Sequence, residues 1–270
     1  MTAKTLAIVD PTDRADGLAL VWDAADAIHK YIAGLGAAVS PDGWVAAGEA
    51  WTYASADDPT FTFTVPGDLT GKYQAGMKIK LTQTTAKYFI VTKVAHAAGT
   101  TTITIYGGTD YDLANAAITL PYYSVVRSPF GFPMDPAKWT VSLNYGGGAQ
   151  ANATAGTIYN LTNIVVPIGA WEIKGNWNHY ASGSTAAQCA FRTGLSTANS
   201  TFSDGNLVKT MTAYIYTNTA EIRSVNAIRK FLALAAKTTY YVNIATIQNA
   251  GTTTVGIAAD CYIEAVCAYL

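Results

Sequence analysis

The residues that could perform chemistry are few and widely separated in this chain. His29, His96 and His179 lie in different parts of the sequence, without the spacing of metal ligands. A zinc site needs several His, Cys or carboxylate groups close together. We therefore interpret each histidine as a surface or capping residue, and we expect no metal and no cofactor. The stretch Asp10–Asp13 could bind a cation, but a turn followed by a helix cap explains it more simply.

The sequence also lacks the usual catalytic motifs. It contains no Gly-x-Ser-x-Gly elbow, and YGGGAQA at 145–151 lacks the lysine and the strand-to-helix context of a phosphate loop. Glycoside hydrolysis needs two carboxylates about 5–9.5 Å apart. A chain with 18 acidic residues always offers some pairing of this kind, so we do not expect an enzyme. The acids that could supply such a pair are Glu172, Asp204, Glu221, Asp260 and Glu264.

Loop aromatics are the better candidates for ligand contact. The apolar face of an aromatic ring can stack on a sugar ring, and Asn or Asp side chains can hold sugar hydroxyls. Ordinary loop packing is the alternative for each of these positions. The candidate glycan-contact residues are Tyr145, Tyr159, Tyr180, Phe202, Asp204 and Asn206.

The composition limits the possible partners. Charged residues make up 13% of the 270 residues, against about 25% in typical globular domains. The net charge is −1 and no basic run occurs, so the positive field that attracts nucleic acid is missing. An uncharged polar surface suits extended assemblies and sugar contact. We expect no nucleic-acid partner.

The cysteines and the hydrophobic runs indicate where the protein is made. Cys189, Cys261 and Cys267 are scattered and odd in number, which favours buried small apolar residues formed in a reducing cytosol. The apolar run near the N-terminus is too short for a signal peptide, and no later run has the length of a membrane span. We expect synthesis in the host cytoplasm, release by lysis and no membrane insertion.

The first segment, residues 1–48, has a helical pattern. Asp13 could cap the helix, Asp16 would favour its N-terminal end, and Gly34 and Gly36 would end it. Its apolar residues are spaced by 3 or 4 positions, as in a short heptad seam. The segment is either an amphipathic helix lying on its own domain or a helix for attachment and oligomerisation. The candidate oligomer seam consists of Leu18, Val21, Ala25, Ile28, Ile32 and Leu35.

The second segment, residues 49–127, is predicted to be a small antiparallel β barrel or sandwich. Runs such as TFTFTV at 60–65, MKIKL at 77–81 and TTITIY at 101–106 alternate apolar and polar residues, with turn residues between them. Short strands at this spacing are typical of barrels and sandwiches. Lys78, Lys80 and Lys87 fall on strand faces that should then face water.

This second segment resembles a module found in structural proteins of tailed bacteriophages. The resemblance covers residues 49–124 and rests on TFTVPGD at 62–68, GMKIKLTQTTAKYFIVTKV at 76–94 and YDLANAAITLPYYS at 111–124. It implies a virion protein and supplies no catalytic residue.

Residues 128–137 form a Pro-rich linker, which we interpret as a semi-rigid spacer. Residues 138–270 then contain about eight strand-like runs, as expected for a jelly-roll sandwich. In one of these runs Trp171, Ile173, Gly175 and Trp177 share one face. Two tryptophans on one face favour a core strand, and a subunit contact is the alternative.

The C-terminal segment resembles the head domains of phage tail and fibre proteins, which are similar to tumour-necrosis-factor and complement-type jelly rolls. The resemblance rests on VVPIGAWEIKGNW at 165–177, LSTANSTFSD at 195–204 and ADCYIEAVCAYL at 259–270. It implies a homotrimer, and the last strand would lie near the three-fold axis.

The sequence therefore predicts a mainly β structural protein of a virion. The expected function is that of a homotrimeric tail fibre, tail tip or spike, attached to other virion proteins through its N-terminal segment and presenting its head to host-surface glycan. The alternatives are a capsid decoration or head-fibre protein and, from another class, a polysaccharide depolymerase.

Overall fold

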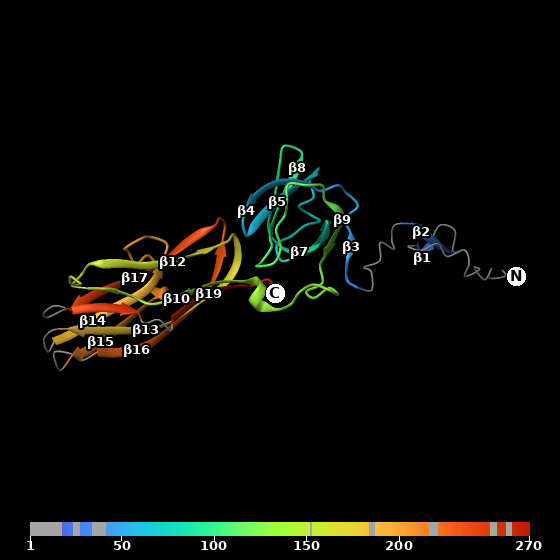
Figure 1. Ribbon diagram of the computed structural model, residues 1–270. Helices are drawn as coiled ribbons and strands as arrows, with labels where there is room; N and C mark the ends of the chain where they lie inside the picture. Colours follow the sequence, from blue (N-terminus) through green and yellow to red (C-terminus); the bar gives the residue numbers. More distant parts are fainter. Residues whose placement is uncertain are drawn as a thin grey trace, which may run out of the picture.

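The computed structural model describes residues 18–23, 28–33, 42–151, 153–183, 187–215, 221–248, 253–257 and 261–270. Within these ranges the chain is mainly β, and hydrogen-bonded neighbouring strands run antiparallel (Figure 1). The predicted mainly β class is confirmed. Among the described residues, no helix is long and apolar enough to cross a membrane.

The helix predicted in the N-terminal segment is wrong for the residues that the structure describes there. Strands β1 (Leu18–Asp23) and β2 (Ile28–Ala33) form an antiparallel hairpin. Both strands contain β-branched or aromatic residues, which favour extended backbone. A heptad pattern of fewer than three repeats is also too short to identify a helix.

The predicted oligomer seam is therefore not a helical stripe. Its members fall on the two strands or outside the described ranges: Leu18 and Val21 lie on β1, Ile28 and Ile32 lie on β2, and Ala25 and Leu35 are outside the described residues.

Residues 45–124 form one seven-stranded sheet with the order β3-β9-β6-β7-β8-β5-β4, curled upon itself (Figure 1). All neighbours pair antiparallel. The strands are β3 (Val45–Ala46), β4 (Thr52–Asp57), β5 (Thr60–Pro66), β6 (Lys78–Gln83), β7 (Thr85–Ala97), β8 (Thr100–Tyr106) and β9 (Thr119–Ser124).

The alternating residues of these strands produce the core of the sheet. Every second side chain points inward, because successive residues of a strand face opposite sides. Full burial of each large apolar side chain stabilises the fold by about 1.5–3 kcal/mol. Trp51 extends the core by stacking on Phe63, with 4.4 Å between the ring centroids. The inward side chains include Phe61, Phe63, Val65, Ile79, Leu81, Phe89, Val91, Ile103 and Ile105.

The expectation that three strand lysines face water is wrong for Lys78. Lys80 and Lys87 are partly exposed, whereas the Lys78 side chain is only 1% exposed. Lys78 lies on the outer face of the curled sheet, opposite Ile79. The C-terminal part of the chain covers this face, since Lys78 Nζ donates to the carbonyl of Tyr269 at 2.5 Å. Sequence alternation cannot reveal such a cover, because the covering residue is 191 positions away.

The C-terminal part consists of two sheets. The six-stranded sheet has the order β10-β19-β13-β18-β11, with β16 also paired to β13, and the four-stranded sheet has the order β12-β17-β14-β15. The strands are β10 (Thr140–Tyr145), β11 (Gly148–Gln150), β12 (Ile158–Val166), β13 (Gly169–Gly183), β14 (Ala187–Ser196), β15 (Val208–Ile215), β16 (Glu221–Leu234), β17 (Thr238–Gln248), β18 (Thr253–Ile257) and β19 (Cys261–Cys267).

Two pairs of these strands each act as one interrupted strand. β13 pairs first with β19 and then with β18, and these two pair in turn with β10 and β11. Counting each pair as one strand, the six-stranded sheet has the order 1-8-3-6 and the four-stranded sheet the order 2-7-4-5. Each sheet thus combines strands from the beginning and the end of the segment, so neither sheet can form from a local stretch of sequence.

The strand with two tryptophans belongs to the core, as the first of its two interpretations predicts. Trp171, Ile173 and Trp177 are buried between the two sheets. Gly175 is required by packing: a Cβ placed there would lie 2.3 Å from the Trp177 ring. The glycine lets the indole fold back over its own strand, which fills the space that a side chain at position 175 would occupy. The subunit-contact alternative is not needed for these residues.

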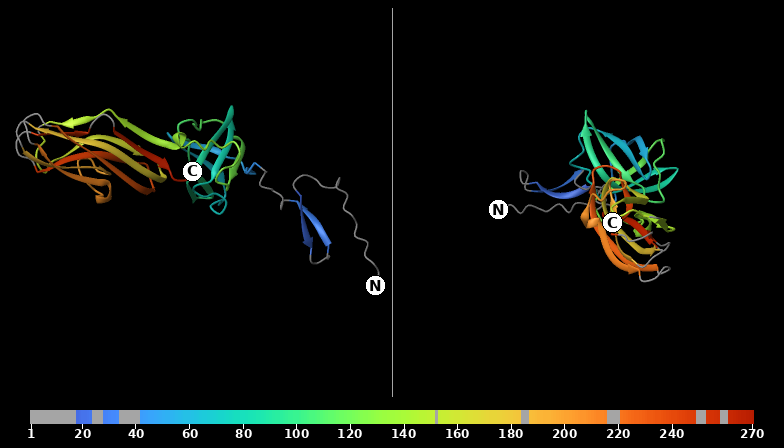
Figure 2. Two further views of the ribbon diagram at one scale, coloured as in Figure 1. Left: turned by 90° about the horizontal axis from the view of Figure 1, so that it is seen from below. Right: turned by 90° about the vertical axis from the view of Figure 1, so that its left-hand side faces the viewer.

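The two β units share one aromatic core where they meet. Tyr106 of β8 packs edge-on against Trp171 of β13, with 5.0 Å between the ring centroids. Trp139 lies 5.9 Å from Tyr106 and stacks on Phe132 at 5.1 Å. Figure 1 and Figure 2 show the two units end to end, with the C-terminus at the junction. The units are therefore joined by buried side chains as well as by the chain itself.

The Pro-rich segment 128–137 runs through this junction. Its Phe132 is buried, and the 3-10 helix η2 (Pro136–Trp139) begins at Pro136 with Asp135 as its N-cap. The segment therefore contributes to the core, in contrast to the predicted spacer. Proline pre-forms the required turns, but the aromatic residues between the prolines are what fix the segment in place.

Candidate functional site

The best-defined loop of the C-terminal unit connects β14 to β15. It comprises residues 197–207, ends in the 3-10 helix η3 (Gly205–Leu207), and contains three of the candidate glycan-contact residues. We call it the 197–207 loop. It follows Ser196, the last residue of β14, and lies over the outer face of the four-stranded sheet, where Asn243 of β17 is opposite Gly194.

Asn243 anchors the 197–207 loop to the sheet. Its side chain is completely buried, although a strand residue on the outer face of a sheet normally meets solvent. Nδ2 donates to the carbonyls of Ala198 at 3.0 Å and Thr201 at 2.8 Å. Oδ1 accepts from the backbone amide of Ser200 at 3.3 Å. One amide side chain therefore replaces the hydrogen bonds that the loop backbone would otherwise make with water.

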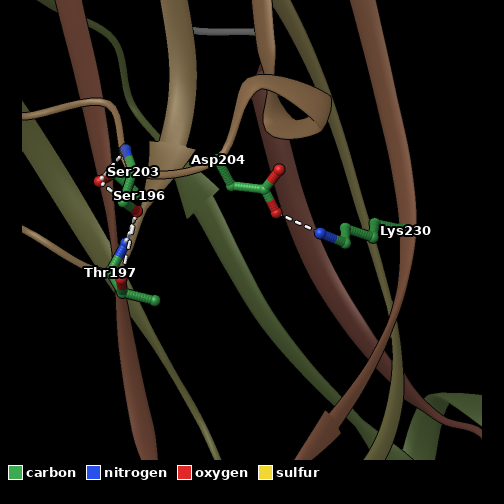
Figure 3. Close-up of polar contacts among 5 residues, drawn as sticks. All are labelled: Ser196, Thr197, Ser203, Asp204 and Lys230. Atoms are coloured by element: carbon green, nitrogen blue, oxygen red, sulfur yellow. Dashed lines mark hydrogen bonds and ion pairs between the residues drawn. The ribbon is translucent and has the colours of Figure 1, made fainter.

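A set of hydroxyl groups closes the base of the loop (Figure 3). Ser196 Oγ accepts from the backbone amides of Ala198 at 3.1 Å and Ser203 at 3.2 Å. Ser203 Oγ lies 3.0 Å from Ser196 Oγ and accepts from the amide of Thr197 at 3.2 Å. The two ends of the loop are thus tied to each other. Because Ser and Thr hydroxyls bond readily to nearby backbone, the residues STANSTFS themselves specify this closure.

Two charged contacts position the side chains that the loop presents. The guanidinium of Arg192 lies over the ring of Phe202, with 5.3 Å from Cζ to the ring centroid. Asp204 forms an ion pair with Lys230 of β16, the edge strand of the other sheet (Figure 3). Both members of this pair are about one-third exposed, so their contribution to stability is small. Their main effect is to link the loop to the six-stranded sheet.

This arrangement presents several groups that could contact a polar ligand. The site offers an aromatic ring beside a cation, a carboxylate paired with an amine, and a backbone held in one conformation. The hydroxyls of Ser196 and Ser203 are engaged with each other and with backbone amides, and no histidine of the described ranges lies in the loop. Among those residues, no group of three or more His, Cys, Asp or Glu side chains is placed to hold a metal ion.

The structure gathers only some of the predicted glycan-contact residues. Phe202, Asp204 and Asn206 belong to the 197–207 loop, although nothing about the Asn206 side chain is described. Tyr159 lies near the start of β12, where its hydroxyl accepts from the amide of Thr154 at 3.0 Å. This contact commits the Tyr159 hydroxyl to its own turn.

Tyr145 and Tyr180 lie on opposite faces of the six-stranded sheet. Tyr145 shares the inward face with Leu143 and packs against the core between the sheets. Tyr180 is opposite Gly256, whose neighbours on β18 point inward, so Tyr180 is on the outer face. Neither residue joins the loop, so the structure does not bring these two candidates together with Phe202 and Asp204. The cause is topological, because residues at strand ends are distributed over both faces.

The acidic residues that could supply a hydrolytic carboxylate pair either form surface ion pairs or have side chains that the structure does not describe. Glu172 of β13 pairs with Arg229 and Lys174, and these ion pairs lower the pKa of its carboxyl against the opposing effect of burial. Lys174 also lies 3.8 Å from Glu264. All of these are on the outer face of the six-stranded sheet. Nothing is described of the Glu221 side chain, and Asp260 is outside the described residues.

Three residues that shape the site could not be identified as site residues from a local sequence pattern. Arg192, Lys230 and Asn243 lie 10 to 40 positions from Phe202 or Asp204 and occupy ordinary strand positions. Alternation along β17 gave one usable signal: Asn243 stands between Val242 and Ile244 in a run of apolar residues. An amide in such a run indicates a specific polar partner, since a buried amide must be hydrogen-bonded.

Comparisons with known proteins give no family. No family model matches the chain, and no curated protein matches it. Solved structures with some likeness include infectious bursal disease virus, Gx strain, at 12% identity, covering 83% of this chain and 57% of that chain with a TM-score of 0.31. The chain thus spans little more than half the length of this neighbour.

Two further likenesses are of the same low order. The infectious bursal disease virus VP2 subviral particle has 10% identity and a TM-score of 0.30, covering 93% of this chain and 64% of that chain. Isomalto-dextranase of Arthrobacter globiformis T6, complexed with panose, has 11% identity and a TM-score of 0.22, covering 80% and 36%. With TM-scores this low, none of these likenesses carries a conclusion about the fold or function of this chain.

Proposed function

We propose that this chain is a non-enzymatic structural protein of a tailed-phage virion. It attaches through its N-terminal segment, assembles as a homotrimer through its C-terminal unit, and presents that unit to host-surface glycan as a tail fibre, tail tip or spike. The observation that carries the proposal is the strand order 1-8-3-6 and 2-7-4-5 of residues 140–267, which is that of an eight-stranded jelly roll. The phage-like sequence of residues 49–124 is its second support.

The outer face of the six-stranded sheet supplies the contact between subunits in this proposal. Phe231, near the end of β16, is 67% exposed, and Tyr262 of β19 is 42% exposed on the same face. Around them lie the ion pairs of Glu172 with Arg229 and Lys174. Exposed aromatic residues inside a ring of charged groups are typical of interface centres. In a trimer, Phe231 would lose most of its contact with water.

The trimer can be tested by replacing Phe231 with glutamate. Interface aromatics of this kind contribute about 2 kcal/mol or more to association, and the new carboxylate would lie opposite Glu172 across the β13–β16 pair. We expect a trimer for the unaltered protein and a monomer for Phe231→Glu in multi-angle light scattering at micromolar concentration.

The matched control is Phe130→Glu, since Phe130 is the more exposed phenylalanine at 82% and lies outside the jelly-roll strands. It should leave the trimer intact. A monomeric unaltered protein, or a Phe231→Glu variant that stays trimeric, would refute this part of the proposal.

The 197–207 loop is the proposed glycan-contact site. Asn243 already holds the backbone of the loop in one conformation, so the loop loses little conformational entropy when a ligand binds. Three loops on one trimer act together, and such multivalency raises the overall affinity by about 10²–10⁴ without any strong single contact. Weak contacts through one aromatic ring and a few polar groups are then sufficient.

Phe202→Ala tests this site. We expect whole-cell adsorption of the trimer to fall by about tenfold or more, because a change of about 1 kcal/mol per site is multiplied over three sites. Thermal unfolding and trimer mass should stay unchanged, since Phe202 is only partly buried. Phe130→Ala is the control of equal chemistry at a remote surface. Equal adsorption by both variants would remove the loop from the receptor-binding role.

A capsid decoration or head-fibre protein is the alternative that the same architecture allows. Electron microscopy of the virion with an antibody against the protein separates the two, because label on the tail supports host attachment and label on the head supports decoration. Release of reducing ends from host polysaccharide would instead indicate the depolymerase.

A further inference from the structure

A cavity of about 280 Å³ opens where the two β units meet. Three short stretches surround it: the turn 74–78 before and into β6, the residues 125–127 that follow β9, and Tyr269 beyond β19. It is distant in sequence from the 197–207 loop and takes no part in the proposed function. Its walls combine apolar side chains of Met77, Val125 and Val126 with the basic residues Lys78 and Arg127.

The cavity contains two positive charges without a negative partner. Among the described residues, neither Lys78 nor Arg127 forms an ion pair. Lys78 is almost completely buried, and its Nζ donates to the carbonyls of Tyr269 at 2.5 Å and Gly76 at 3.3 Å. An ammonium group has three N–H donors; besides these two carbonyls, Lys78 Nζ contacts the face of the Phe132 ring, 5.4 Å from its centroid.

A buried positive charge close to a second one is energetically unfavourable by itself. Burial disfavours the charged amine, Cys267 opposes this effect, and Arg127 adds to it; together they lower the pKa of Lys78 to about 8. An uncompensated buried charge destabilises a protein unless it gains a partner. A negative group between the two residues would compensate both charges.

The shape of the surroundings favours a carboxylate with a small apolar body. A guanidinium binds a carboxylate through two parallel hydrogen bonds, and the ammonium of Lys78 adds a second positive charge to the same cavity. Met77, Val125 and Val126 then offer an apolar wall to the carbon atoms of the ligand. Val125 is 65% exposed, so the wall is open on the solvent side and a ligand can enter without displacing any strand.

We propose that this cavity is a carboxylate-binding site in which Lys78 and Arg127 hold the anion and Met77, Val125 and Val126 contact its aliphatic part. The carboxylate comes either from a free short-chain acid or from a Glu or Asp side chain of a neighbouring protein.

The experiment uses the full chain with lysine labelled by ¹³C at the ε carbon, observed by NMR. The first probe is butyrate, with the isosteric neutral amide butyramide as its control. The second is the peptide acetyl-Val-Glu-Val-amide, with its Gln counterpart as control. We expect saturable movement of the Lys78 resonance with at least one anionic probe and none with the neutral ones. Binding by butyrate indicates a free acid, and binding by the peptide alone indicates a protein side chain.

Two variants identify the residues that hold the anion. Arg127→Gln removes an exposed charge that supports no described strand, and it should weaken binding by about tenfold or more, because hydrogen bonds to charged groups contribute about 1.5–3 kcal/mol. Lys78→Met fills a similar volume without charge and should abolish binding. Lys93→Gln, which changes an exposed lysine of β7, should have no effect.

The pH dependence gives an independent readout. A bound carboxylate favours the protonated amine, so it should raise the pKa of Lys78, and affinity should fall as the pH rises through about 8. The proposal is overturned if no anionic probe moves the resonance, if the neutral probes bind as well, or if Arg127→Gln binds as tightly as the unaltered protein.

Discussion

Replacing Trp171 by alanine is expected to lower the free energy of unfolding by about 3–5 kcal/mol, the loss usual for a buried Trp replaced by Ala. Trp171 is completely buried on β13 and packs edge-on against Tyr106 of the first β unit. Its removal leaves a cavity where the two units meet. We therefore also expect the two units to unfold in separate steps, in place of one cooperative transition.

The matched control is Trp171→Phe. Among the residues that the structure describes, the indole Nε1 of Trp171 finds no hydrogen-bond partner, so phenylalanine keeps an aromatic ring and removes an unsatisfied donor. We expect Trp171→Phe to lower the free energy of unfolding by about 1 kcal/mol. Urea unfolding followed by circular dichroism and by tryptophan fluorescence measures both effects. A Trp171→Ala variant no less stable than Trp171→Phe would show that the junction does not couple the units.

Replacing Asn243 by alanine is expected to lower the free energy of unfolding by about 2–4 kcal/mol and to release the 197–207 loop. The side chain satisfies the carbonyls of Ala198 and Thr201 and the amide of Ser200. Each buried polar group left without a partner costs about 1–3 kcal/mol. The total is reduced because a released loop can bond to water.

Hydrogen exchange measured by mass spectrometry separates the two parts of this effect. Peptides covering the loop should exchange much faster in Asn243→Ala, while those of β13 and β19 stay protected. Asn163→Ala is the control, since Asn163 is an exposed residue of β12. Host-cell adsorption should fall with the order of the loop. A variant with a disordered loop and full adsorption would separate the loop from receptor binding.

The strands of residues 60–106 could be predicted from sequence because one face of each is buried and the other is not. Phe61, Phe63 and Val65 show this period of two directly, and the corresponding strand is β5. The same argument identifies the inward face of β13 from Trp171 and Trp177. These predictions need only local information, since they depend on which side of a strand faces a core.

Other features depend on residues that are remote in the sequence. Lys78 is buried because Tyr269 covers it, and Asn243 is buried because the 197–207 loop folds over it. No local pattern contains either contact. The predicted N-terminal helix was wrong for another reason. Over a short stretch, apolar residues spaced by 3 or 4 positions can also arise from two successive β-strands. The apolar pattern of residues 18–33 has too few repeats to distinguish a helix from a β hairpin.

The shared aromatic core at the junction also affects how the molecule would meet a surface. Because Tyr106, Trp139 and Trp171 pack together at the junction, we expect the two β units to move as one body. A force applied to the C-terminal unit would then be transmitted to the first β unit. In the proposed trimer, the distances between the three C-terminal units would then be nearly constant. Receptors at a matching, regular spacing would therefore be bound more tightly than sparse ones.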